Sequence, residues 1–490
     1  MARHLRSSSA TETDALYRPL PQSEAVSEAT SSPLELEGDE ELVAEEFVAQ
    51  ERLASHDRRI GWIHFILGSA ILLPWNALIT ATPYFLSRVE GSPLKSTFSS
   101  YLSTTFTFAN FAFLAHATAT TDQSTNSRRI LLSISWLTLL MFLLTLSTYI
   151  HSSPGVFFAF VLVNGICQAA AGSYLQTAVI AVASFFGPTA IQPIMSGQAA
   201  IGVAVSGIEV LSAASSLRNS APAEARVDPE PEEKSAFIFF GLSTLFLLIS
   251  AGAQIWLTKL PLYKALKDRF RQATEHTRSL SPGDFDEGYT PPVDSRDHIL
   301  HEEKKHQLVR IAKTNVIYNI AVAYVFIVTL SVFPPITISV QSTNPAAHPL
   351  LFSAIHFFVF NIGDFLGRYL CSFPRLLIWS AKRLLVFSLA RTLFIPVFLM
   401  CNVQRSPSAS GNGAIITSDI LFMLILLIFG LSNGYLSSMC MMSAPSVEHN
   451  PRLKGRVEDV EVAATVASFC LVGGLATLDV VMVYKQNVVL

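Results

Sequence analysis

Two opposite charges lie four residues apart inside a long apolar run of the sequence, at Asp364 and Arg368. This spacing places both side chains on one face of a helix, and Asn361 and Phe357 lie on the same face. A charge at the centre of a membrane-spanning helix costs roughly 2.5–3.5 kcal/mol on insertion scales, so such charges usually pair or line a watery cavity. The pattern favours a patch that binds a molecule rich in hydroxyls or amides over a salt bridge that only stabilises packing.

Two other apolar runs carry groups that could take part in binding. Pro74 bends the first run, and Trp75 beside it lies at mid-span, away from the interfacial belt that tryptophan usually occupies. Trp75 could line a substrate site or be buried between helices, and the sequence favours neither. Gln176 in the fourth run has an amide that both donates and accepts hydrogen bonds. Its partner could be a substrate or a neighbouring helix.

Several classes of chemistry find no support in the sequence. There is no G-x-x-x-x-G-K-[ST] loop and no G-x-G-x-x-G loop, which argues against an ATP-driven pump. The five cysteines are isolated in or beside apolar runs, without metal-ligand spacing. The net charge of −3 argues against a nucleic-acid partner. We therefore expect no enzymatic activity, no catalytic residues, no cofactor and no metal.

The elements that position these groups are long apolar runs. The chain is 50% hydrophobic and 14% charged, whereas soluble domains are about a quarter charged. Each run is long enough to cross about 30 Å of hydrocarbon. The sequence predicts an all-α membrane protein with about eleven transmembrane helices, in a six-plus-five, two-bundle arrangement that resembles the major facilitator fold. The runs lie near residues 60–86, 97–119, 130–150, 154–182, 194–216, 235–258, 313–338, 348–370, 382–402, 418–443 and 459–483.

Composition divides the chain into four segments. Residues 1–59 are polar and acidic, which predicts a disordered cytoplasmic tail. Residues 60–258 form an N-terminal bundle of six helices, and residues 313–490 form a C-terminal bundle of five. Residues 259–312 form a charged cytoplasmic linker loop, helical near 262–277. A linker of this kind suits a transporter whose halves rock about a central site.

The distribution of lysine and arginine predicts the orientation. They are about threefold more frequent in the loops on the side of the tail, which places the N-terminus in the cytoplasm and the C-terminus on the opposite side. Residues 184–192, between the fourth and fifth runs, favour a tight turn over a re-entrant break. In the tail, Tyr17-Arg-Pro-Leu20 fits a Y-x-x-Φ contact site for a sorting adaptor, a pattern short enough to arise by chance.

Five motifs of the apolar region point to one family. They are Leu72-Leu-Pro-Trp-Asn76, Phe360-Asn-Ile-Gly-Asp-Phe-Leu-Gly-Arg368, Pro193-Ile-Met-Ser-Gly-Gln198, Phe333-Pro334 and Ser432-Asn-Gly-Tyr-Leu436. Taken together, they resemble the equilibrative nucleoside transporter family, from Gly61 to about Val481. A fungal-type, vacuolar-like member is among the candidates. Ala70 and Ala199 stand where the family usually has glycine, which bears on substrate preference more than on class.

The resemblance implies transmembrane transport of nucleosides, and sometimes nucleobases, by facilitated diffusion with alternating access. Its partners would be a nucleoside, such as uridine or adenosine, and the lipid bilayer. It implies that Asp364 and Arg368 bind ribose hydroxyls and that Gln176 holds the base. Trp75 would pack on the sugar and base. The remaining substrate-binding residues implied by the resemblance are Leu72, Ile79, Phe333, Phe357 and Asn361.

Two other functions stay open at the level of sequence. The same fold could couple nucleoside export from an acidic organelle to protons, with Asp364, Glu209 or His356 as the protonatable group. A receptor or scaffold that does not transport would use the charged linker as its platform, although two charges on one intramembrane face argue against it. The membrane is expected to be the plasma membrane or a vacuolar or lysosomal membrane.

Overall fold

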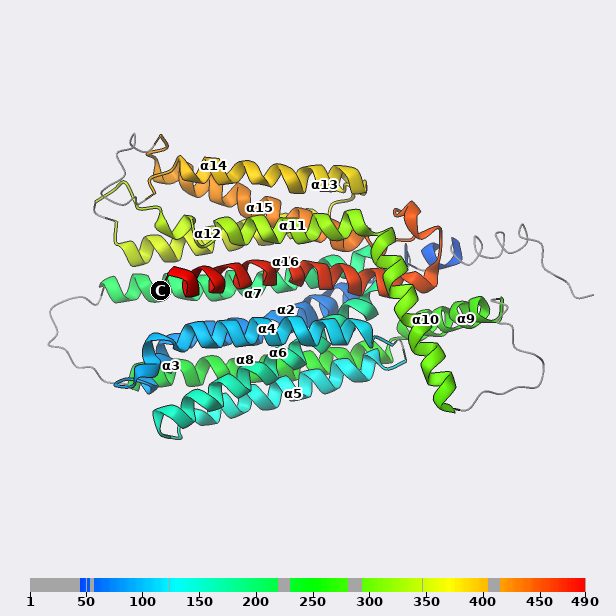
Figure 1. Ribbon diagram of the computed structural model, residues 1–490, viewed down its shortest axis with the longest axis horizontal. Coiled ribbons are helices and arrows are strands. Elements are labelled where there is room, and N and C mark those ends of the chain that lie inside the picture. The colour runs from blue at the N-terminus through cyan, green and yellow to red at the C-terminus, as the bar shows by residue number, and fades with distance from the viewer. Residues whose placement is uncertain are drawn as a thin grey trace, which may run out of the picture.

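The computed structural model describes residues 45–49, 51–52, 57–122, 124–218, 230–280, 293–345, 347–403 and 415–489. Its long helices lie side by side along one direction (Figure 1). Nine helices of this described part are long and apolar enough to cross a membrane. They are α2 (Arg58–Thr80), α5 (Asn126–Ser147), α6 (Pro154–Ser184), α7 (Pro188–Arg218), α8 (Glu230–Lys259), α11 (Val316–Val332), α12 (Pro349–Leu370), α15 (Asp419–Ser443) and α16 (Val460–Val489).

Two of the eleven expected spans are not among these nine candidates. The run at 97–119 forms α4 (Phe98–Ala119), whose many serines and threonines lower its hydropathy. The run at 382–402 is divided into α13 (Ala381–Ala390), a 3-10 turn η4 (Arg391–Leu393) and α14 (Phe394–Leu399). Both segments still run beside the other helices (Figure 1). The structure confirms an all-helical protein with nine candidate membrane spans in the described residues, and the count of eleven stays a prediction.

The fourth and fifth apolar runs are joined by a tight turn, as expected. Helix α6 ends at Ser184 and α7 begins at Pro188, with only three residues between them. Gly187 in this turn has a φ of 77°, which an L-residue with a side chain rarely adopts. Pro188 then opens α7, where its missing N–H costs nothing.

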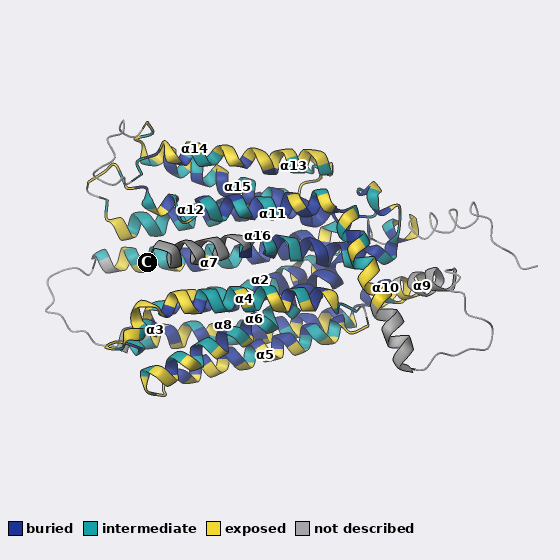
Figure 2. Ribbon diagram, in the orientation of Figure 1, coloured by how far each residue is buried: buried dark blue, intermediate teal, exposed yellow. Residues whose placement is uncertain are grey.

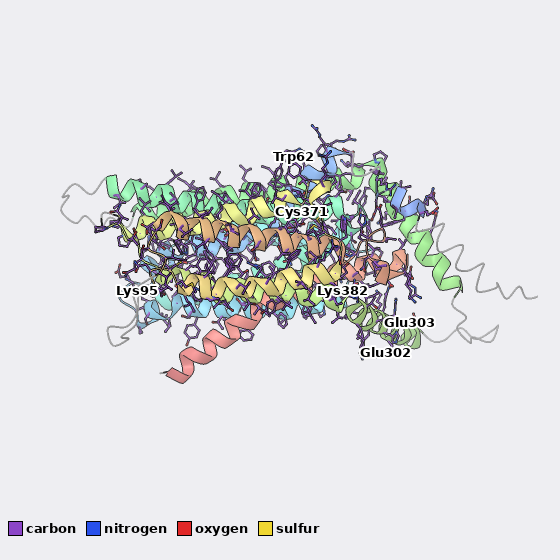
Figure 3. The ribbon with its side chains drawn as sticks, turned by 90° about the horizontal axis from the view of Figure 1, so that it is seen from above. Trp62, Lys95, Glu302, Glu303, Cys371 and Lys382 are labelled. Atoms are coloured by element: carbon purple, nitrogen blue, oxygen red, sulfur yellow. The ribbon has the colours of Figure 1, made fainter. Side chains whose placement is uncertain are left out.

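The charged linker contributes two helices at one end of the bundle (Figure 1). They are α9 (Pro261–Leu280), longer than the expected helix near 262–277, and α10 (Val293–Thr314). Figure 3 places Glu302 and Glu303 of α10 at this end and Lys95 at the other. An ion pair of 2.7 Å joins Arg310 of α10 to Asp459, which directly precedes α16.

A short segment of the acidic tail packs against the same end. Residues 45–49 and 51–52 are helical, and Phe47 is buried with Phe185 and Val460. This packing orders residues that composition alone assigns to a disordered tail. Burial raises the pKa of Glu51 to about 8. The Tyr17–Leu20 motif lies outside the described residues.

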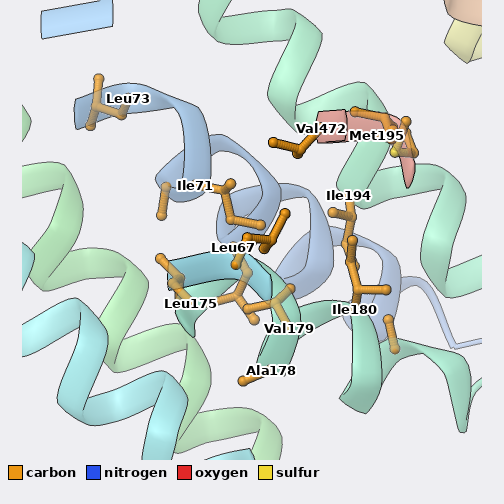
Figure 4. Close-up of a cluster of buried hydrophobic side chains, with 14 of the residues drawn as sticks. Leu67, Ile71, Leu73, Leu175, Ala178, Val179, Ile180, Ile194, Met195 and Val472 are labelled. Atoms are coloured by element: carbon orange, nitrogen blue, oxygen red, sulfur yellow. The ribbon is translucent and has the colours of Figure 1, made fainter. Parts of the chain in front are cut away.

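The apolar core joins the helices along much of their length. Figure 4 shows Leu67 and Ile71 of α2 beside Leu175 and Val179 of α6, with Ile194 of α7 close to them. Buried residues lie along the inner sides of the helices, whereas exposed ones mark the outer sides and the helix ends (Figure 2). Apolar outer sides are expected where helices face lipid.

Helices α12 and α15 cross with their backbones in contact. A Cβ added at Gly363 of α12 would collide with the backbone of α15, and one at Gly434 of α15 would collide with the carbonyl group of Asp364. Gly367 and Gly430 make the same kind of contact. Small residues spaced four apart allow membrane helices this close approach. The crossing therefore fixes the depth and rotation of the helix turn that carries Asp364.

We expect Gly434→Ala to destabilise the protein by about 1–3 kcal/mol, because the added methyl group overpacks this crossing. Thermal unfolding of the purified protein in detergent measures the effect. The matched control is Gly241→Ala in α8, where an added Cβ meets nothing within 4 Å. Equal melting temperatures for the two variants would contradict the role assigned to the crossing.

Candidate functional site

The predicted charge pair forms on α12. The Nε of Arg368 donates to Oδ2 of Asp364 over 2.9 Å, and both residues are buried. The Nη1 of Arg368 also donates to the carbonyl oxygen of Met195 on α7, over 3.1 Å. Gln192 of α7 donates its amide to the carbonyl oxygen of Arg368 over 3.0 Å. The pair thus lies where a helix that precedes the linker meets one that follows it.

The second oxygen of Asp364 is held by a residue that the sequence did not assign to the site. Nδ2 of Asn433 on α15 donates to Oδ1 of Asp364 over 2.6 Å. Asn433 belongs to the Ser432–Leu436 motif of the family resemblance, which was the available signal. Each oxygen of Asp364 thus accepts one N–H hydrogen bond, from Arg368 on its own helix and from Asn433 on α15.

A second buried arginine lies behind Asn433. Arg391 is the first residue of η4 and is only 2% exposed. Its guanidinium donates to the carbonyl oxygens of Val325 at 2.7 Å and Phe429 at 3.3 Å. It also donates to Oγ1 of Thr329 at 3.0 Å and Oδ1 of Asn433 at 3.2 Å. The signal in the sequence was an arginine in the middle of the apolar run at 382–402, a position that the sequence analysis did not assign to the site.

Two of the predicted aromatic residues, Phe333 and Phe357, meet beside α12. Phe333, directly after α11, stacks on Phe360 at 4.0 Å between ring centroids and meets Phe357 edge-on at 5.0 Å. Asn361 donates to the carbonyl oxygen of Phe357 over 3.0 Å. Its own oxygen faces α7, where a Cβ at Gly202 would come within 2.8 Å. Asn361 therefore packs at the α7 contact, one turn from Asp364.

The residues predicted on α2 form a separate group. Trp75 is half-buried and stacks on Phe106 of α4, with ring centroids 4.2 Å apart. Leu72 is half-buried, and its carbonyl oxygen accepts from Nδ2 of Asn76 over 2.9 Å. Ile79 is 45% exposed. Trp75 therefore packs against α4, and its contact with a substrate stays a prediction.

Gln176 is bonded to a helix that lies far away in the sequence. Its Nε2 donates to Oγ of Ser468 on α16 over 2.9 Å, and both residues are buried. Ser468 was missed, because a single serine in an apolar helix carries no sequence signal of its own. In the described part of the chain, no hydrogen bond or ring contact joins Trp75 or Gln176 directly to Asp364.

Several bonds of this region join helices before the linker to helices after it. Gln176 reaches Ser468 of α16, and Arg368 reaches back to Met195 of α7. Asn126 of α5 donates to Oε1 of Glu461 on α16 over 2.7 Å. Two side chains that the sequence assigned to substrate binding therefore also hold the two groups of helices together. Among the described residues, no cluster of three or more His, Cys, Asp and Glu side chains could hold a metal.

Comparison with known proteins identifies the family. Residues 159–484 match a family model described as nucleoside transporter. The chain belongs to the nucleoside transporter family. This confirms the resemblance predicted from the sequence and places the buried charge pair in a transporter.

Relatives of this nucleoside transporter align over most of its length. Rat equilibrative nucleoside transporter 1 is 26% identical over 84% of this chain and 94% of that protein. Human equilibrative nucleoside transporter 2 is 28% identical over 85% of this chain and 94% of that protein. The yeast nucleoside transporter FUN26 is 24% identical over 78% of this chain and 76% of that protein. Among solved structures, the E. coli fucose:proton symporter FucP has a TM-score of 0.46 at 13% identity, covering 87% of this chain and 92% of that chain.

The charge pair of the transporter can be tested for stability apart from transport. We expect Arg368→Met to destabilise the protein by about 3–5 kcal/mol, because it leaves the buried Asp364 carboxylate without its cation. The double variant Asp364→Asn/Arg368→Met should recover most of this loss, since neutral groups of similar volume replace the whole pair. Thermal unfolding in detergent compares the two. A double variant no more stable than Arg368→Met would contradict the pairing.

Proposed function

We propose that this protein carries nucleosides across a membrane by facilitated diffusion. The observation that carries the proposal is the buried Asp364–Arg368 pair at the contact between α12 and α7, in a chain of the nucleoside transporter family. Relatives named equilibrative nucleoside transporters align over more than four fifths of the chain, at 84% and 85%. Charges are costly in a bilayer and are kept there mainly along substrate or ion pathways.

The chemistry of the site fits an uncharged nucleoside. A carboxylate offers about four lone-pair sites, and two of those on Asp364 are taken by Arg368 and Asn433. The remaining sites can accept from ribose hydroxyls, with Arg368 donating to the same sugar. Gln176 would hold the base through its amide, and Trp75 would offer an aromatic face. Leu72, Ile79, Phe333, Phe357 and Asn361 would complete the pocket.

The same proposal includes eleven spans, six before the linker and five after it. Helix α4 has 22 residues, about 33 Å at 1.5 Å per residue, which is enough to cross a bilayer. The segment α13–η4–α14 would be the other additional span. With the linker helices α9 and α10 in the cytoplasm, the N-terminus is cytoplasmic and the C-terminus is on the other side. The membrane is the plasma membrane or that of an organelle.

Alternating access requires the bonds between the two groups of helices to break and re-form. In the described part of the chain they include the single hydrogen bonds Arg368–Met195, Gln176–Ser468 and Asn126–Glu461. Single hydrogen bonds that can be exchanged one at a time are compatible with a rocking motion of two bundles.

The names of the relatives favour uniport over coupling to protons, because these proteins are called equilibrative nucleoside transporters. Each oxygen of Asp364 accepts one N–H hydrogen bond, from Arg368 or from Asn433, which leaves lone pairs for substrate hydroxyls. His356 has Nε2 3.1 Å from Oγ1 of Thr337 and lies against Phe333 and Phe357. Glu209 on α7, the third protonatable group that the sequence offers, is half-buried, and the pH dependence of uptake tests all three groups.

Uptake measurements test the proposed site. We expect Asp364→Ala and Arg368→Ala to lower uptake of radiolabelled uridine or adenosine into proteoliposomes at least tenfold. Each variant removes a charge-assisted hydrogen bond to the sugar, and a loss of about 1.4 kcal/mol of binding free energy lowers affinity about tenfold. Glu90→Ala and Lys95→Ala serve as controls, since these residues form an exposed ion pair of 3.0 Å away from the site. Uptake like that of the wild type by both Asp364→Ala and Arg368→Ala would refute the site.

The pH dependence of uptake tests the mechanism. We expect the initial rate of uridine uptake to stay constant between about pH 5 and pH 7.5, a range that spans the usual pKa of histidine. The measurement uses proteoliposomes at equal inside and outside pH, and then with an imposed pH gradient. Accumulation of uridine driven by the gradient would show proton coupling and contradict uniport.

A further inference from the structure

Arg391 is a buried cation that, within the described residues, donates its side-chain hydrogen bonds to neutral groups. In the described residues its guanidinium contacts two carbonyl oxygens, the hydroxyls of Thr329 and Ser432, and the amide oxygen of Asn433. The guanidinium also lies over the Phe429 ring, 4.6 Å from its centroid. Removing a guanidinium from water is costly even when it is well bonded. A leucine would fill this space without that cost. Packing alone therefore does not explain why an arginine occupies position 391.

Its bond to Asn433 determines which way that amide points. Oδ1 of Asn433 accepts from Nη1 of Arg391 over 3.2 Å and from the hydroxyl of Thr329 over 2.6 Å. An amide rotated by 180° would direct its NH₂ at these two donors, which cannot both accept. The amide oxygen is therefore held toward Arg391, and Nδ2 is held toward Asp364. There it donates to Oδ1 over 2.6 Å.

We propose that Arg391 is a positioning residue for substrate recognition, which acts through Asn433 to fix the carboxylate of Asp364 for a sugar hydroxyl. This inference rests on the proposed function. The chain of contacts is Arg391–Asn433–Asp364, with Thr329 as a second donor to the middle member. Arg391 touches no substrate itself. Its effect is to hold Asp364 from one side while Arg368 holds it from the other.

The location of Arg391 suits this role. It begins the 3-10 turn η4, which interrupts the helical segment between α13 and α14. From there its side chain reaches Val325 and Thr329 on α11, and Phe429 and Asn433 on α15. A side chain that joins two helices also stabilises the fold. The test must therefore separate positioning from stability.

The decisive variant is Arg391→Lys, which keeps the cation but loses the forked donor geometry. We expect its KM for adenosine to rise about tenfold, the effect of one weakened charge-assisted hydrogen bond to the sugar. Its KM for 2′,3′-dideoxyadenosine should stay that of the wild type, because this analogue has no ribose 2′- or 3′-hydroxyl for Asp364 to bind. Uptake is measured in proteoliposomes and normalised to folded transporter.

A milder variant keeps the test decisive if Arg391→Lys does not fold. Thr329→Val removes the second donor to Asn433 at nearly constant volume, and should raise KM for adenosine about threefold, less than one full hydrogen bond is worth. The matched control is Thr145→Val on α5. Thr145 is also buried, and its hydroxyl donates only to the carbonyl oxygen of Met141, over 2.9 Å. This control should leave KM for both nucleosides unchanged.

Each outcome distinguishes the inference from the proposed function. Equal losses for adenosine and the dideoxy analogue, in Arg391→Lys or in Thr329→Val, would show a purely structural role and overturn the inference. A wild-type protein that does not discriminate between the two nucleosides would also overturn it, while leaving nucleoside transport in place. A wild-type protein that transports neither nucleoside would refute the proposed function itself.

Discussion

A carboxylate inside a bilayer must have its charge and its lone pairs satisfied by the protein, and much of the described structure around α12 serves this requirement. Asp364 receives an N–H from Arg368 on its own helix and another from Asn433 on α15. Arg368 extends the contact to α7 through the carbonyl oxygen of Met195. Three helices that are far apart in sequence are thereby tied to one charged group, which the low dielectric of the membrane makes costly to leave unpaired.

This requirement explains the close crossing of α12 and α15. An amide can reach a carboxylate on the next helix at 2.6 Å only if the two backbones approach closely. Glycines at the crossing, among them Gly363 and Gly434, remove the side chains that would keep the backbones apart. Packing in lipid then replaces the hydrophobic effect as the main attraction between the helices. Packing and polar contacts therefore stabilise the same crossing.

The predicted substrate-binding residues also take part in contacts between the two groups of helices. Gln176 bonds Ser468, and Arg368 bonds Met195. The side chains proposed to bind a substrate are thus the same side chains that bond the two groups of helices together. Such sharing offers a physical route by which occupancy of the site and the arrangement of the helices influence one another.

The sequence by itself determined the class of the protein, because apolar runs of sufficient length and mid-span charges are local patterns. The pairing of Asp364 with Arg368 was predictable for the same reason, since four residues make one helical turn. The partners of these residues were not predictable. Asn433 lies 69 positions from Asp364, and Ser468 lies 292 positions from Gln176. Only helix packing brings such residues together. It also places Arg391, which the sequence analysis did not assign to the site, beside Asn433.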